Sequence, residues 1–151
     1  MKLAEFEEYK LHLLDSKDGS AFEGYLELAM THLEKAAAFT TGQFTPEKII
    51  QKAKNNLCLI FNVTHNDENI ASVLVTVSRR EDGLCCSIEL TAWEEGHYKT
   101  IMEQFLDDIE AHMKKRHAIS NMRIVGRPGQ HDLLEGLGYT PTHFLAEKRL
   151  S

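Results

Sequence analysis

The spacing of apolar side chains changes several times along the chain, and each change predicts a new element. Over residues 20–37 and 98–117 the apolar positions follow a helical repeat, whereas over 70–78 they alternate. The first pattern predicts an amphipathic helix and the second predicts a strand. We therefore predict helices at 20–37, 46–54, 98–117 and 128–137, and strands at 8–14, 57–63, 70–78, 84–92, 122–126 and 142–150.

The order of these elements predicts an α+β fold. The strands at 57–63, 70–78 and 84–92 follow one another through short turns, which favours antiparallel pairing. The helix at 98–117 then connects strand 84–92 to strand 122–126, and a connection of this length joins parallel neighbours. We expect a mixed, mostly antiparallel central sheet with one parallel β-α-β unit and helices on both faces.

The composition is typical of one globular domain over residues 1–151, because 42% of the residues are hydrophobic and 26% are charged. The net charge of −6 and the lack of a lysine- and arginine-rich run argue against a nucleic-acid partner. The first ten residues are acidic, and no stretch approaches the roughly eighteen apolar residues of a membrane span, so we expect no membrane partner and a cytoplasmic protein. Three cysteines and scattered histidines predict buried thiols and no metal site.

The stretch 121–150 carries a distinctive series of elements. A short apolar strand ends at Gly126, the sequence GRPG at 126–129 breaks it, and a short helix ends in LGY at 137–139. Pro128 is placed near the first helical position and Gly138 at the helix end. With a final strand that ends in EKRL, this series resembles the C-terminal end of the GNAT-type acyl-CoA N-acyltransferases, and more narrowly small phage-encoded GNAT-like proteins.

The resemblance implies that acetyl-CoA binds where strand 84–92 meets the following helix. GNAT proteins hold the pyrophosphate there with a Gln/Arg-x-x-Gly-x-Gly/Ala turn, and a helix N-terminus suits a phosphate because its N–H groups are unpaired. Only Gly96 agrees with that pattern, and Lys99 and Arg127 are further candidates for phosphate contact. The same stretch also fits a capping box from Thr91 to Glu94, in which the chain itself satisfies the helix end. The residues at the position of the turn are Trp93, Glu94, Glu95, Gly96, His97 and Tyr98.

Acyl transfer to an amine also needs a base and an acid. Glu89 is our candidate base, because a carboxylate between Ile88 and Leu90 has a raised pKa if the strand buries it. The alternative is a solvated residue on a polar strand face. The tyrosine that serves as acid in the family falls on Leu134 here, with Tyr139 and His131 nearby. Tyr139 is our catalytic candidate, and its alternative role is a core anchor with a solvated hydroxyl.

Two functions follow from the resemblance. The first is an acyl-CoA-dependent N-acyltransferase that transfers an acetyl group to a primary amine on a small molecule or a protein. The second is a noncatalytic GNAT-fold phage protein, located in the host cytoplasm or the virion, with a virion-associated or host-interaction role. Fold analogy alone does not decide between them. The sequence does not determine the oligomeric state, and a homodimer is compatible with it.

Overall fold

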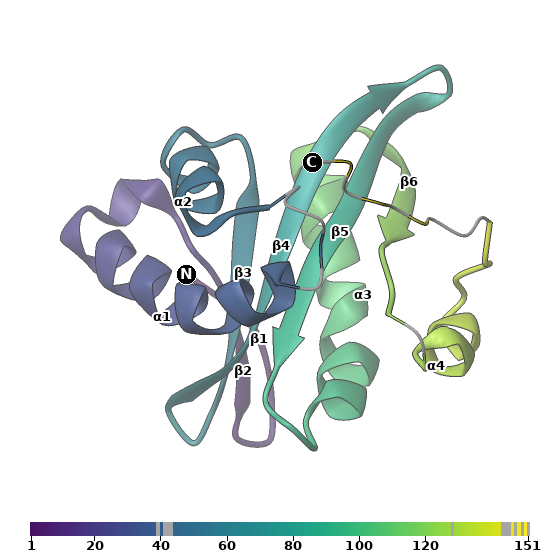
Figure 1. Ribbon diagram of the computed structural model, residues 1–151. Helices are drawn as coiled ribbons and strands as arrows, with labels where there is room; N and C mark the ends of the chain where they lie inside the picture. Colours follow the sequence, from purple (N-terminus) through teal and green to yellow (C-terminus); the bar gives the residue numbers. More distant parts are fainter. Residues whose placement is uncertain are drawn as a thin grey trace.

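The computed structural model describes residues 1–38, 40, 44–127, 129–142, 146, 148 and 150, and its strands form a single sheet (Figure 1). The strands lie in the order β1-β2-β3-β4-β5-β6. Their bounds are β1 Lys2–Phe6, β2 Tyr9–Leu13, β3 Leu59–His65, β4 Glu68–Arg80, β5 Gly83–Trp93 and β6 Ile119–Ile124. The helices are a 3-10 turn η1 Ser16–Asp18, α1 Ser20–Ala37, α2 Pro46–Lys54, α3 Tyr98–Arg116 and α4 His131–Gly136.

The sheet is mixed, as predicted. Each neighbouring pair from β1 to β5 is antiparallel, whereas β5 and β6 are parallel and are connected through α3. The β-α-β unit expected from the chain order is therefore confirmed. No helix in the described ranges is long and apolar enough to cross a membrane.

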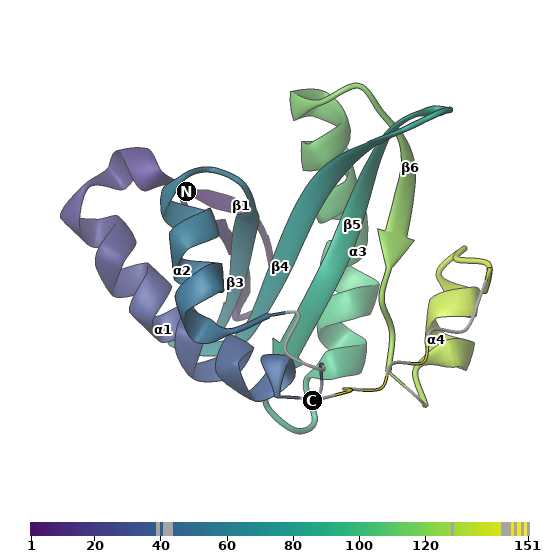
Figure 2. The ribbon, with the colours of Figure 1, turned by 45° about the horizontal axis from the view of Figure 1, so that its top comes forward.

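Helices cover both faces of the sheet (Figure 2). The buried side of α3, which includes Phe105 and Ile109, packs on one face of β2 to β5. The other face packs against α1 and α2 through residues such as Leu33 and Ile49. Burial of two such apolar layers is the main contribution to folding, since each large buried side chain contributes about 1.5–3 kcal/mol. The predicted α+β architecture with helices on both faces is confirmed.

A β-bulge in β5 moves its side chains from one face to the other. The register with β4 shifts between Leu74 and Val75. Val75 is opposite Ile88 and Leu74 is opposite Leu90, so Glu89 between them has no partner in β4. Ile88 packs on the α3 face, whereas Leu90 packs on the α1 face. An extra residue of this kind bends the strand and re-aims its side chains.

The structure corrects the sequence predictions at the two ends of the chain. The strand predicted at 8–14 is confirmed as β2, but it is not the first strand, because residues 2–6 form β1 and pair with it through a turn at Glu7, where φ is +53°. The helix predicted at 128–137 begins only at His131; Pro128 lies outside the described residues. Most of the strand predicted at 142–150 also lies outside them.

Candidate functional site

β5 and β6 separate at one end of their pairing. Their register ends at Ile88 opposite Ile124, and the Val125 N–H donates the last hydrogen bond to the Ile88 carbonyl at 3.0 Å. β5 continues to Trp93, so residues 89–93 have no strand partner on this side within the described part of the chain. Unpaired backbone at a strand edge can pair with an extended ligand. The separation therefore creates a place where such a ligand can meet the end of β5.

Glu89, the predicted base, is the residue at which this separation begins. Its carboxylate accepts a hydrogen bond from Thr76 Oγ1 at 3.3 Å and lies 3.8 Å from Arg123 Nη2. The side chain is only 14% exposed. Thr76 and Arg123 alternate with residues that pack on the α3 face, so all three polar side chains point to the opposite face. The bulge thus holds a shielded carboxylate beside the separation on the α1 face.

The turn that follows β5 leaves the start of α3 open. The N-cap of α3 is His97, which makes no side-chain capping bond among the described residues, and the first turn carries no acidic residue. The predicted capping box from Thr91 to Glu94 is wrong, because Thr91 belongs to β5 and the Glu94 N–H donates to the Ile70 carbonyl at 2.8 Å. Gly96 has φ +89°, a conformation that glycine adopts without strain. No side chain of the described residues therefore caps the positive end of the α3 dipole.

Trp93, Tyr98 and Arg127 form a stack between β5 and the chain after β6. The rings of Trp93 and Tyr98 are 4.2 Å apart, and the Arg127 guanidinium lies 4.8 Å from the centre of the Trp93 ring. Arg127 Nη2 also donates to the Thr91 carbonyl at 3.3 Å. Burial raises the pKa of Tyr98 to about 12, which Arg127 partly opposes, and burial lowers the pKa of Arg127. The three predicted site residues are therefore brought together at the separation.

Two side-chain contacts fix the turn from opposite faces of the sheet. On the α1 face, His32 Nε2 lies 3.5 Å from Glu94 Oε1. On the α3 face, the Tyr9 hydroxyl is 2.8 Å from His97 Nδ1, and the Tyr9 ring stacks on His65 with centroids 4.1 Å apart. The sequence predicted neither the contact of His32 with Glu94 nor the link between Tyr9 and His97. The turn is therefore held at both of its ends.

A cavity of about 390 Å³ opens beside the turn on the α1 side. Its volume lies at the lower end of the roughly 300–1,000 Å³ typical of ligand pockets. Positive and negative side chains share its wall, so it suits a polar ligand better than an apolar one. The lining includes His32, Lys35, Trp93, Glu94, Glu95 and Arg127.

Tyr139, the predicted catalytic residue, lies away from Glu89. It packs with the α3 face of the core, and its hydroxyl donates a hydrogen bond to the Glu110 carboxylate. Burial and this bond raise the pKa of Tyr139. Through this bond Glu110 anchors the segment after α4. The structure therefore brings Glu89 and Tyr139 to opposite faces of the sheet.

The remaining candidates are exposed. Lys99 is the second residue of α3 and pairs with Glu103 at 3.8 Å, and Glu95 is exposed beside the cavity. Among the described residues, the only group with the spacing of metal ligands is the exposed set His131, Asp132 and Glu135 on α4. Two carboxylates and one imidazole on a six-residue helix also form ordinary surface ion pairs.

Solved structures with the same arrangement of elements are acetyltransferases. A predicted acetyltransferase from Clostridium acetobutylicum, solved with acetyl-CoA, is 17% identical and has a TM-score of 0.64, with 94% of this chain and 96% of that chain covered. The glucosamine-6-phosphate N-acetyltransferase of Arabidopsis thaliana is 15% identical, with a TM-score of 0.62 and coverage of 96% and 100%. An aminoglycoside acetyltransferase from an uncultured soil metagenomic sample, in complex with sisomicin, is 10% identical, with a TM-score of 0.65 and coverage of 94% and 97%.

These likenesses extend over nearly the full length of each protein, so no large part of the fold is missing or added. No protein-family model and no curated protein sequence matches the chain. At identities of 9–17% the likeness rests on three-dimensional arrangement rather than on shared residues. The chain has the fold of the GNAT acetyltransferases.

Proposed function

We propose that this protein is an acyl-CoA-dependent N-acyltransferase that transfers an acetyl group to a primary amine. The observation that carries the proposal is the separation of β5 from β6 directly after Ile88, with the shielded carboxylate of Glu89 beside it. Within the described part of the chain, a strand edge without a strand partner, a helix N-terminus without a side-chain cap and a shielded carboxylate supply three features that suit acyl transfer from a thioester. They meet here at one point of the fold.

The residues present are compatible with acetyl-CoA. The start of α3 offers N–H groups with no side-chain cap among the described residues, and Arg127 lies close enough to supply a positive charge to a phosphate. The bulky pair Trp93 and Tyr98 takes the place of the small residues in the family turn, but the two rings stack on each other. Glu94 is turned towards His32 on α1. These contacts direct the bulk and one of the two carboxylates to partners within the protein.

Bound acetyl-CoA supplies a thioester, which is already activated for attack by an amine. The carboxylate of Glu89 accepts a proton from the attacking amine, and its bonds to Thr76 and Arg123 hold it in one orientation. The hydroxyl of Tyr139 is occupied by Glu110 on the other face, so in this proposal the departing thiolate takes its proton from water. The cavity beside His32 and Glu95 receives the amine acceptor, which is either a small molecule or a protein side chain.

A specific observation favours the second function, a noncatalytic GNAT-fold protein with a virion-associated or host-interaction role. Arg127 donates to the Thr91 carbonyl, so a side chain of the protein already uses part of the edge that a ligand must reach. The family's acid position holds Leu134. If this arrangement is permanent, the fold remains and acyl transfer is lost.

The chain contains one tryptophan, so its fluorescence reports directly on the candidate site. We expect acetyl-CoA to change the Trp93 emission with a Kd in the micromolar range, and the same Kd to be measured by calorimetry. A panel of primary amines is then tested for release of free CoA thiol. Thiol release that depends on both substrates supports the enzyme.

Two other outcomes separate the alternatives. Binding without turnover for any amine retains the cofactor site but contradicts the transferase. An unchanged Trp93 spectrum and no heat at millimolar acetyl-CoA contradict both the cofactor site and the transferase, and leave the noncatalytic function. Dephospho-CoA serves as a control ligand for the pyrophosphate contact, because it keeps the pantetheine and the pyrophosphate of CoA.

A further inference from the structure

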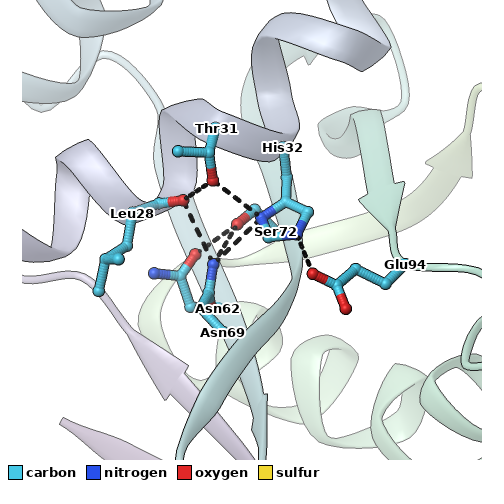
Figure 3. A network of polar contacts seen from close by, with 7 residues as sticks. All are labelled: Leu28, Thr31, His32, Asn62, Asn69, Ser72 and Glu94. Atoms are coloured by element: carbon cyan, nitrogen blue, oxygen red, sulfur yellow. Dashed lines mark hydrogen bonds and ion pairs between the residues drawn. The ribbon is translucent and has the colours of Figure 1, made fainter.

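His32 lies in a polar network beside the apolar side chains that pack between α1 and the sheet (Figure 3). The residue is 9% exposed and comes from α1. The network extends through Asn69 and Ser72 of β4 to Asn62 of β3, where the Ser72 hydroxyl donates to Asn62 Oδ1 at 2.7 Å. On its other side His32 faces Glu94 in the turn before α3. One imidazole therefore connects the core of the sheet to the candidate site.

The neighbours of His32 determine which of its nitrogens carries the proton. Asn69 Nδ2 lies 3.3 Å from His32 Nδ1 and 3.4 Å from the Leu28 carbonyl. A carbonyl only accepts, so the amide nitrogen of Asn69 must face this side, although Asn69 Oδ1 then has no partner among the described residues. The Thr31 hydroxyl donates to the same carbonyl at 2.7 Å, so its proton is also engaged there. With the Asn69 amide in this orientation, we assign Nδ1 as the acceptor and place the proton on Nε2.

This arrangement places the imidazole beside the carboxylate of Glu94. His32 Nε2 lies 3.5 Å from Glu94 Oε1, an ion-pair distance, and a buried imidazole held on its other side has little freedom to turn away. The side chain of Glu94 is 55% exposed, so without this contact the carboxylate has other rotamers available. Some of these bring a negative charge nearer to the start of α3. A carboxylate there competes directly with a phosphate group for the same N–H groups.

We propose that His32 is a positioning residue that holds the Glu94 carboxylate against α1 and so keeps the start of α3 clear for a phosphate. Its importance for ligand binding rests on the proposed function, whereas the contact with Glu94 and its effect on the turn do not. In this role the imidazole touches neither the ligand nor the reacting atoms. It acts through Glu94, and the network of Asn69, Ser72 and Asn62 acts through His32.

The experiment compares His32→Leu, His32→Gln and the double variant His32→Leu/Glu94→Gln. Leucine fills the buried volume but cannot donate, whereas glutamine places an amide nitrogen near the position of Nε2. Two quantities are measured: amide hydrogen exchange of residues 95–98, and the Kd for acetyl-CoA from Trp93 fluorescence. The control His112→Leu removes a half-buried histidine of α3, on the opposite face of the sheet, whose ring meets Phe61 edge-on.

We expect His32→Leu to speed exchange in the turn about threefold or more, because a fixed contact is lost. We expect it to weaken acetyl-CoA binding about three- to tenfold, the effect of one freed carboxylate roughly 6 Å from a phosphate in a screened setting. His32→Gln should restore both quantities towards the wild type. The double variant should restore the Kd but not the exchange, because it removes the charge without restoring the contact.

The proposal is overturned if His32→Leu matches the wild type in turn exchange, or if leucine and glutamine behave alike, since packing alone then accounts for His32. It is also overturned if the double variant binds as weakly as His32→Leu. Failure of the wild type to bind acetyl-CoA contradicts the proposed function, and in that case the exchange data still decide whether His32 holds the turn. His112→Leu should change neither quantity.

Discussion

The hydroxyl of Tyr139 offers a direct test of whether this tyrosine is an anchor or a catalytic acid. Tyr139→Phe removes the hydrogen bond to Glu110 and leaves the ring in the α3 face of the core. A hydrogen bond to a charged group contributes about 1.5–3 kcal/mol. Both side chains are only half-buried, so water partly replaces the bond and the lower end, about 1.5 kcal/mol, is expected. For a chain of this length that corresponds to a fall in Tm of about 3–6 °C.

Urea unfolding followed by circular dichroism measures this loss. The midpoint should fall in Tyr139→Phe with an unchanged denaturant slope, and Glu110→Gln should show a smaller loss because the amide oxygen still accepts. The double variant should be less destabilised than the sum of the two, since both changes remove one interaction. An unchanged midpoint in Tyr139→Phe would refute the anchoring role. A large fall in turnover at full stability would instead support the acid.

Three further outcomes are expected. Arg127→Leu should shift the emission of Trp93 to longer wavelength, because the guanidinium that covers the ring is lost; an identical spectrum would contradict the stack. Glu89→Gln should lower turnover about 10²–10⁴-fold and leave the Kd for acetyl-CoA unchanged, and equal turnover would exclude Glu89 as the base. Stability should fall above pH 10. Unfolded tyrosine ionises near 10, whereas burial raises the pKa of Tyr98 to about 12 and also raises that of Tyr139, so the native state keeps protons that the unfolded state loses. Urea midpoints from pH 8 to 12 should decline less in Tyr98→Phe.

The sequence predicted the elements whose buried faces are long and regular. The helix at 98–117 and the strand at 70–78 were found within a few residues of their expected bounds, because many periodic positions specify each one. β1 was missed because it is a five-residue strand at the edge of the sheet with no fully buried residue. The parallel pairing of β5 with β6 followed from the helix between them.

The contacts of the candidate site were beyond prediction for a physical reason. Tyr9 and His97 are separated by 88 positions in the chain, so no local pattern connects them. The contact of His32 with Glu94 depends on how α1 lies across the sheet and on the rotamers of both side chains. The bulge at Glu89 was also hidden, because Cys86, Ile88, Leu90 and Ala92 alternate without interruption in the sequence although the structure divides them between two faces.

That division depends on Glu89 staying outside the ladder with β4. If Glu89 took a paired position instead, every later side chain of the strand would turn to the other face. Leu90 would then be directed towards α3 and Trp93 towards α1, with the aromatic stack dismantled and an apolar layer facing the wrong helix. A single-codon gap at Glu89 leaves those faces unchanged, so homologues of this protein should tolerate a gap there more readily than at the paired positions on either side.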